Sequence, residues 1–308
     1  MRPFASVILY FASVITLGAL LAPPLYWGFM AVTESGVLTA FADTPFRRMA
    51  NRAFLLVAIA GLPLLVRSLS VKGRSEWGYG IPRKDWIGSA LCGLAYGLVT
   101  MGLLVVAEYV MRIVVWDDRR VMSDLVIALL SGLAAGVFIG LLEETFFRGV
   151  LFTAFRRQSL RVAILVPAVL YAGCHFISSR GDYSTVTWSS GFEVLAGAFW
   201  QFSLANLGPF LALLAVGIFL GMLREYSGHI GWAVGIHAGW VAIIRLGREG
   251  TSFNPEANLA WMAAGYDSIT GYLAFFYLSA MIVALHLHQK RRARSSFEDL
   301  AEDVAEAG

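Results

Sequence analysis

Long apolar runs recur from one end of this 308-residue chain to the other, and they constrain its fold more than any other feature. Only 15% of the residues are charged and 58% are hydrophobic, whereas soluble domains are about a quarter charged. In lipid every backbone polar group needs a partner within the protein, so only helices and closed β-barrels span membranes. The runs are continuous rather than alternating, which argues against a barrel. The sequence therefore predicts an all-α, polytopic helical membrane protein.

Eight runs meet or approach the ~20 apolar residues that a membrane-spanning helix needs. They cover about residues 4–30, 53–66, 87–115, 125–144, 162–177, 207–223, 230–246 and 272–287. A further apolar stretch, 192–205, is expected to be interfacial or re-entrant. We divide the chain into N-terminal transmembrane helices (1–124), a core (125–245), and a last helix with its tail (246–308). The tail is basic and then acidic, and we expect it to be poorly ordered.

Lysine and arginine are distributed unequally between the two ends of these runs. With eight spans, fifteen of the 24 fall on one side and eight on the other, while Arg112 lies inside the third run. Because cytoplasmic loops carry the excess of Lys and Arg, we expect a multi-pass protein of the cell membrane, surrounded by the lipid bilayer, with both termini in the cytoplasm. The net charge of +3 is small and the basic residues are scattered, so no nucleic-acid partner is indicated.

Three charges interrupt the end of the fourth run: Glu143, Glu144 and Arg148. A charge at membrane depth costs about 2.5–3.5 kcal/mol on insertion scales, so such a cluster indicates a functional site. On a helix, Glu144 and Arg148 are four residues apart with the acid first, the favourable order for an ion pair. Glu143 lies about 100° around the helix from Glu144. We therefore expect Arg148 to hold one carboxylate and to leave the other free.

Two of the five histidines, His175 and His237, lie in later apolar runs beside small residues. Buried polar groups need partners, and small residues let membrane helices approach closely, so we expect both to share a site with the charged cluster. A free glutamate in an apolar pocket becomes a general base near neutral pH, and a histidine can stabilise an oxyanion. Two histidines and one glutamate also form a common catalytic zinc set. Spacing does not choose between a metal-free site and one in which Glu143, His175 and His237 bind Zn²⁺.

The charged cluster resembles the EExxxR motif of the CPBP family of intramembrane proteases, with Glu143, Glu144 and Arg148 at its defining positions. That family includes type II CAAX prenyl proteases, bacteriocin-processing proteins and Abi-like proteins. Two later motifs follow in the family's order, and the resemblance covers about residues 125–245. It identifies this segment as a CPBP-like protease core.

Both later motifs depart from the family pattern. FxxxH appears as Tyr171 to His175, with tyrosine in place of phenylalanine, whose volume its ring can fill. HxxxN or HxxxD begins at His237 but ends at Val241, which has no polar group. The oxyanion site is therefore either weaker here or completed by another side chain. The candidates for that replacement are Trp240 and His229.

The resemblance implies an intramembrane endopeptidase, of glutamic or metallo type, whose substrate is a membrane protein or lipidated peptide, prenylated or C-terminally anchored. It implies Glu143 as the base that activates water, assisted by His175. Glu144 and Arg148 would orient the site, and His237 would stabilise the oxyanion. Two alternatives stay open. One is a catalytically silent immunity or scaffold protein, which the departure at Val241 would suit, and the other is an ion-coupled transporter using the same charges.

Overall fold

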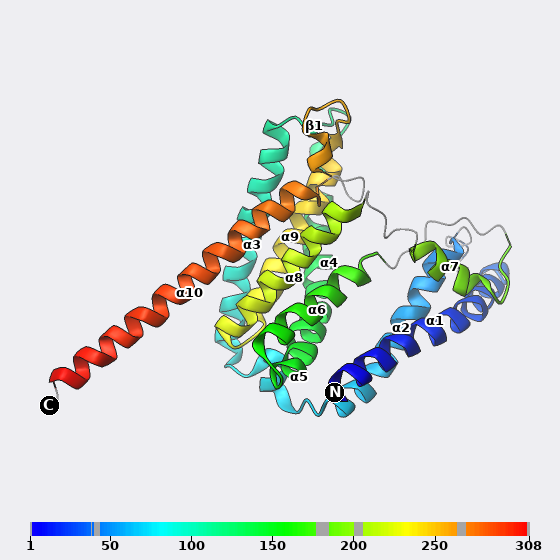
Figure 1. Ribbon diagram of the computed structural model, residues 1–308. Coiled ribbons are helices and arrows are strands. Elements are labelled where there is room, and N and C mark those ends of the chain that lie inside the picture. The colour runs from blue at the N-terminus through cyan, green and yellow to red at the C-terminus, as the bar shows by residue number, and fades with distance from the viewer. Residues whose placement is uncertain are drawn as a thin grey trace. The chain divides into compact units, whose positions relative to one another are not determined.

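The computed structural model of the chain describes residues 2–37, 39, 44–176, 185–199, 206–263 and 269–306, and these are almost entirely helical (Figure 1). The α-helices are α1 (Arg2–Glu34), α2 (Phe46–Leu69), α3 (Arg83–Val110), α4 (Met122–Glu144), α5 (Phe152–Arg156), α6 (Leu160–Cys174), α7 (Ser190–Phe199), α8 (Leu207–Ser227), α9 (Gly231–Gly250) and α10 (Tyr272–Glu306). The shorter elements are the π-helical segments η2 (Ser75–Tyr79) and η3 (Thr145–Leu151), the 3₁₀ turn η5 (Ala260–Met262), and the strands β1 (Val114–Trp116) and β2 (Thr251–Phe253).

The protein is an all-α polytopic membrane protein, as its composition predicts. Within the described ranges, six helical stretches are long and apolar enough to cross a bilayer. They are α1, α2, α3 with η2 before it, α4 continuing through η3 and α5, α8, and the first part of α10. The predicted fifth and seventh runs correspond to the shorter apolar helix α6 and to α9. The stretch 192–205 begins in α7, and its last residues, 200–205, lie outside the described residues.

The chain packs into two compact units. Unit 1 comprises Met1–Lys72 with Gly173–Leu204, and unit 2 comprises Gly73–Ala172 with Ala205–Gly308. The division at residues 125 and 245 follows sequence motifs rather than packing, and it stays a prediction.

In unit 1, α1 packs against α2, and α7 packs against both. The buried centre of this unit is small-residue rich, with Ala22, Ala50 and Ala53 beside Phe46 and Val194. Small residues let helix backbones come close, which is the main way in which helices associate in lipid. The hydroxyl of Tyr10 also donates a hydrogen bond to the carbonyl of Ala58 at 2.9 Å and so links α1 to α2.

In unit 2, α9 lies between α3 and α4 and packs against both (Figure 1). Glycines at four-residue spacing make these contacts possible. A Cβ atom on Gly136 of α4 would lie 2.7 Å from the carbonyl oxygen of Ala238, and one on Gly235 of α9 would lie 2.0 Å from that of Ala90. No side chain fits at such distances, so glycine sets the spacing of the three backbones. The glycines concerned are Gly93 and Gly97 of α3, Gly132 and Gly136 of α4, and Gly231, Gly235 and Gly239 of α9.

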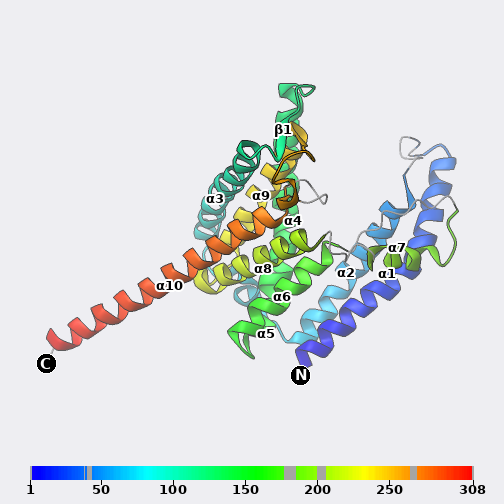
Figure 2. The same cartoon turned by 45° about the horizontal axis from the view of Figure 1, so that its top comes forward.

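A small antiparallel ribbon closes one end of unit 2. Strand β1 pairs with β2, with Val114 opposite Phe253 and Trp116 opposite Thr251, so the ribbon joins the ends of α3 and α9. Elsewhere in the unit, α10 packs against α8 and then continues as a helix to Glu306 (Figure 2). The tail that we expected to be poorly ordered thus continues α10 as a helix, and its lack of order stays a prediction. The tail from Lys290 contains four alanines and three glutamates, residue types that favour helix.

Candidate active site

The charged motif lies where α4 changes its helical form. Helix α4 ends at Glu144, and the next seven residues continue it as the π-helical segment η3. Such segments are uncommon and often occur at functional sites. The buried positions of α4 recur every fourth residue and end in the motif: Ala128, Gly132, Gly136, Gly140 and Glu144. The glycine stripe that admits α9 therefore leads directly to the second glutamate of the motif.

Glu144 and Arg148 form the ion pair that their spacing predicts. Nη1 of Arg148 donates to Oε1 of Glu144 at 2.8 Å, and the two side chains are 2% and 0% exposed. Nη2 of Arg148 also donates a long hydrogen bond, 3.4 Å, to the carbonyl of Gly217 in α8. Removing one partner of such a buried pair leaves an uncompensated charge, which is strongly destabilising. The pair thus ties α4 and η3 to α8.

Tyr171 covers the guanidinium of Arg148. The Cζ atom of Arg148 lies 4.6 Å from the centre of the Tyr171 ring, and Tyr171 is only 3% exposed. A cation over the face of a desolvated aromatic ring gains about 2 kcal/mol. The Tyr171 ring also meets Phe147 edge to face, with centroids 5.4 Å apart. Tyrosine in place of phenylalanine therefore keeps an aromatic face against the arginine.

His237 joins the same carboxylate from α9. Its Nδ1 atom lies 2.9 Å from Oε1 of Glu144, and the histidine is 5% exposed. A carboxylate paired with arginine is ionised and can only accept hydrogen bonds. Nδ1 of His237 therefore carries the proton and donates it, which fixes the orientation of the ring.

The other ring nitrogen of His237 faces Glu143. Nε2 lies 3.8 Å from Oε2 of Glu143, too far for a direct hydrogen bond. The Glu143 side chain is 29% exposed whereas that of Glu144 is fully buried. Among the described residues, Oε2 of Glu143 and Oε2 of Glu144 both lack a hydrogen-bond partner, but the other oxygen of Glu144 is held by Arg148 and His237. The division into one held and one available carboxylate thus has a geometric basis.

The charges of this cluster sum to zero when His237 is protonated on both nitrogens. Glu143 and Glu144 contribute two negative charges, and Arg148 and His237 contribute two positive ones. Isolated charge is costly in a membrane interior. Neutrality therefore favours an imidazolium with Nε2–H directed toward Glu143.

His175 lies one residue beyond the end of α6 and belongs to unit 1, whereas Glu143, Glu144, Arg148 and His237 belong to unit 2. Its expected partnership with Glu143 stays a prediction. Over the ranges that the structure describes, no group of three or more metal-ligating side chains occurs. The expected zinc set of Glu143, His175 and His237 therefore stays a prediction.

The two side chains suggested as replacements for a polar group at Val241 have other partners. Nε1 of Trp240 donates to the hydroxyl of Thr100 in α3 at 3.0 Å, so this N–H is already used. His229 lies before α9, and its Nδ1 accepts a hydrogen bond from the backbone N–H of Gly231 at 3.1 Å. Burial and the nearby Arg224 lower the pKa of His229. It thus caps the start of α9 as a neutral side chain.

A contact from outside the motif reaches its third residue, Thr145. The Thr145 hydroxyl donates to the carbonyl of Leu141 at 2.6 Å, so the hydroxyl of Tyr79 donates to Thr145, also at 2.6 Å. Segment η2 can lie this close because Gly149 has no side chain: a Cβ there would be 2.6 Å from the carbonyl oxygen of Trp77. The sequence contains no pattern that links Tyr79 to the motif, although the glycine that follows Arg148 is a hint of close packing.

Comparison with known families identifies part of the chain. Residues 125–243 match the family model described as type II CAAX prenyl endopeptidase Rce1-like. Neither the curated proteins nor the solved structures yielded a match to the chain. The matched segment runs from the second turn of α4 to the middle of α9, and it contains every residue of the three motifs.

Proposed function

We propose, from the premise that residues 125–243 are a domain of the Rce1-like type II CAAX prenyl endopeptidase family, that this membrane protein is an intramembrane endopeptidase. The observation that carries the proposal is the placement of His237 between two unlike carboxylates. Its Nδ1 is fixed by buried Glu144 at 2.9 Å, and its Nε2 faces the partly exposed Glu143 at 3.8 Å. One imidazole is thereby held still beside a carboxylate that is free to react.

Glu143 acts as the general base in this proposal. A water oxygen can lie about 2.8 Å from both Oε2 of Glu143 and Nε2 of His237, because these atoms are 3.8 Å apart. Glu143 takes a proton from this water as the oxygen attacks the carbonyl carbon of the substrate. The resulting oxyanion accepts a hydrogen bond from Nε2–H of His237, whose charge Glu144 stabilises through Nδ1.

The second half of the reaction returns the proton. The tetrahedral intermediate collapses, its carbon–nitrogen bond breaks, and Glu143 gives its proton to the leaving amine. One water is consumed, and a new carboxyl and a new amino terminus appear. Glu144 and Arg148 exchange no proton, since they serve to hold His237 in place.

The family implies a protein substrate, and the depth of the site suggests one held at the membrane. We propose a membrane-associated protein, prenylated or anchored near its C-terminus, as the substrate. The excess of Lys and Arg on one side supports an orientation in which both termini and the motif end of α4 face the cytoplasm. Cleavage would then occur near the cytoplasmic membrane face.

Glu143, His175 and His237 are also the residues that would bind a zinc ion in this proposal. If His175 approaches Glu143 and His237, the three form the His₂Glu set of catalytic zinc sites, in which the metal lowers the pKa of bound water. Activity that 1,10-phenanthroline removes and Zn²⁺ restores would support this set. Activity that survives the chelator would leave Glu143 and His237 as the water-activating pair.

The proposal is tested by quantitative mass spectrometry of membrane proteins from cells that express the wild type or Glu143→Gln. Glu256→Gln, a change at an exposed carboxylate far along the chain, is the matched control. We expect at least one membrane protein to be cleaved with the wild type and the control, and to stay intact with Glu143→Gln. Cleavage in H₂¹⁸O should place one ¹⁸O in the new C-terminal carboxyl. Identical membrane proteomes would contradict the proposal.

A further inference from the structure

A cavity lies along the seam between α4 and α9 in unit 2. Its volume is about 530 Å³, within the range of about 300–1,000 Å³ that is usual for small-molecule sites. Six of its eleven lining residues are apolar, and the four charged ones gather at one end. The lining residues are Asp124, Ile127, Ala128, Ser131, Ala135, Ile139, Val241, Ile244, Arg245, Arg248 and Glu249.

The apolar end of this cavity leads toward the candidate active site. On α4, Ser131, Ala135 and Ile139 line the cavity at four-residue spacing, and the next position in that series is Glu143. On α9, Val241 lines the cavity four residues after His237. One helical turn of this kind rises about 6 Å. The cavity therefore ends within about one turn of the two groups that we propose activate water.

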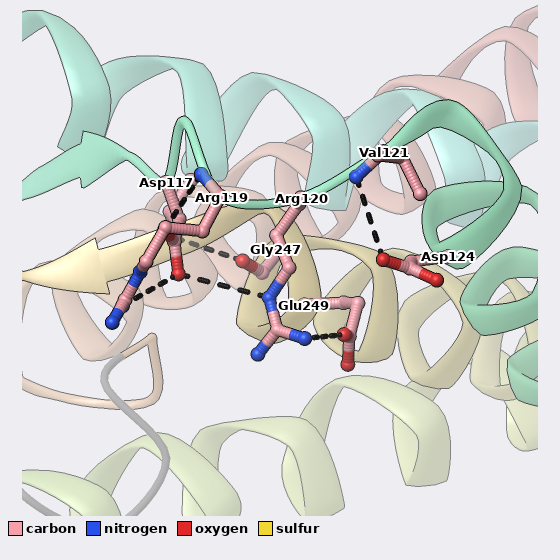
Figure 3. A network of polar contacts seen from close by, with 8 residues as sticks. Asp117, Arg119, Arg120, Val121, Asp124, Gly247 and Glu249 are labelled. Atoms are coloured by element: carbon pink, nitrogen blue, oxygen red, sulfur yellow. Dashed lines mark hydrogen bonds and ion pairs between the residues drawn. The ribbon is translucent and has the colours of Figure 1, made fainter.

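The charged end of the cavity carries two unpaired arginines. Arg245 and Arg248 are exposed, and no ion pair joins either to another described residue. The two carboxylates in the lining, Asp124 and Glu249, have partners other than these arginines. Glu249 pairs with Arg120 at 2.7 Å, and Asp124 accepts a hydrogen bond from the Val121 N–H at 3.4 Å (Figure 3). With Arg120 neutralising Glu249, this end has one more positive than negative charge.

The charged end of the cavity, which we call its mouth, lies next to the ribbon of unit 2. Asp117 follows β1 and pairs with Arg119 at 2.8 Å and Arg120 at 3.7 Å (Figure 3). Its backbone N–H also donates to the carbonyl of Gly250 at 3.0 Å. Arg120 thus bridges Asp117, which follows β1, and Glu249, which lies at the end of α9 just before β2. These contacts link the end of α9 to the segment that precedes α4.

We propose that this cavity binds an extended segment of the substrate next to the cleaved bond, and that an acidic substrate residue pairs with Arg245 or Arg248. This inference rests on the endopeptidase function proposed above. Arg245 and Arg248 follow His237 by eight and eleven residues, which corresponds to about 12 and 16 Å along the helix. An extended peptide advances about 3.3 Å per residue. The acidic residue is therefore four or five residues from the cleaved bond.

The cavity favours a peptide over a lipid because its apolar end lies about one helical turn from Glu143. A phospholipid would use the apolar wall and the arginines, but it would gain nothing from an inner end that adjoins the reacting groups. If a peptide binds along the same wall, the peptide bond that follows the bound segment lies beside Glu143. Holding the two reactants in register is a large part of what an enzyme contributes to rate.

The first test blocks the cavity without touching the motif. The probe is the membrane protein that mass spectrometry shows to be cleaved only when Glu143 is present. Ala135→Trp fills the cavity wall, and Ala134→Trp, the exposed neighbour on the same helix, is the control. We expect the first to slow cleavage at least about tenfold and the second to leave it unchanged. Thermal unfolding of both purified variants verifies that each is folded.

The second test reverses the charge at the mouth. Arg245→Glu with Arg248→Glu should slow cleavage of the same protein, and changing the substrate's acidic residue to lysine should restore it. Arg161→Glu, at an exposed arginine outside the cavity, is the control and should change nothing. Rescue by the reversed pair is a result that a merely structural role of the arginines would not produce.

The outcomes separate this inference from the proposed function. If no protein is cleaved in a Glu143-dependent manner, the endopeptidase itself is contradicted. If cleavage depends on Glu143 but proceeds at the wild-type rate in folded Ala135→Trp and in the double arginine variant, the substrate groove is overturned while the enzyme stands. Native mass spectrometry showing that Ala135→Trp loses a bound phospholipid, with cleavage unchanged, would assign the cavity to lipid instead.

Discussion

Nδ1 of His237 lies 2.9 Å from Oε1 of Glu144, and the same carboxylate oxygen accepts a hydrogen bond from Arg148 at 2.8 Å. One buried oxygen thus holds two cationic groups from different parts of the chain. The consequence is that the second glutamate of the motif positions the histidine as well as pairing with the arginine. The roles of Glu144 and His237 are therefore coupled, and replacing either should disturb the other.

Replacing Arg148 by methionine should destabilise the protein by about 3–5 kcal/mol, because Glu144 would then be a buried carboxylate without its main cation. The measurement is thermal unfolding of the detergent-purified protein. Adding Glu144→Gln to Arg148→Met should recover much of that loss, since no unpaired charge remains. The double variant should nevertheless be inactive, because His237 loses its ionised partner. If the double variant is less stable than Arg148→Met, the coupling of these charges is wrong.

Two glycines on one face of α4 should respond differently to alanine. A Cβ on Gly136 would lie 2.7 Å from the backbone oxygen of Ala238, so Gly136→Ala should cost about 1–3 kcal/mol of stability. A Cβ on Gly140 meets nothing closer than 3.4 Å, an ordinary contact, and Gly140→Ala should unfold within a degree or two of the wild type. Equal melting temperatures for the two variants would contradict the close approach of α4 and α9.

The contact between Tyr79 and Thr145 should contribute about 1 kcal/mol, the usual net value of one hydrogen bond. Tyr79→Phe removes the hydroxyl but keeps the ring that stacks on Trp86, with centroids 5.5 Å apart. Unfolding of this variant should therefore occur slightly below the wild-type temperature. Tyr109→Phe, at an exposed tyrosine, should show no change. The same shift in both variants would mean that the hydroxyl of Tyr79 has no specific role.

Asp117 makes the stability of the ribbon end depend on pH. Its hydrogen bond with Arg119 lowers the pKa of Asp117 to about 2, whereas an unfolded aspartate has a pKa near 3.9. Because the folded value is depressed, the carboxylate stabilises the fold above about pH 4 and loses this effect as the pH falls toward 2. Asp117→Asn should therefore melt below the wild type at pH 7 and at the same temperature near pH 2. The exposed neighbour Asp118 provides the control, Asp118→Asn. A difference that does not change with pH would contradict this account of the ion pair.

The sequence was sufficient to predict the helices because their signal is local. Each apolar run becomes a helix, although α2 begins seven residues before its expected limit and α10 ends nineteen residues beyond its own. The ion pair of Glu144 and Arg148 forms as their four-residue spacing predicts. The sequence did not predict the length of α10, because the charged residues of the tail favour contact with solvent and its alanines and glutamates favour helix at the same time.

The partners within the site were harder to predict, because they depend on packing between distant segments. His237 and Glu144 are 93 residues apart, and only the three-dimensional meeting of two glycine faces brings them into contact. The four-residue glycine spacing in both helices was a signal that would have predicted their register. The π-helical form of η3 and the link from Tyr79 had no comparable signal, since both depend on how η2 lies against the motif.

The most direct test of the central claim compares Glu143→Gln with Glu144→Gln, measuring both cleavage of the membrane protein found by mass spectrometry and the thermal unfolding of each purified variant. We predict that Glu143→Gln unfolds like the wild type and cleaves nothing, because only the reacting carboxylate is lost. Glu144→Gln should unfold at a clearly lower temperature, because Arg148 and His237 lose their shared anion. Full cleavage by Glu143→Gln, or a stable Glu144→Gln beside an unstable Glu143→Gln, would contradict the division of labour between the two glutamates.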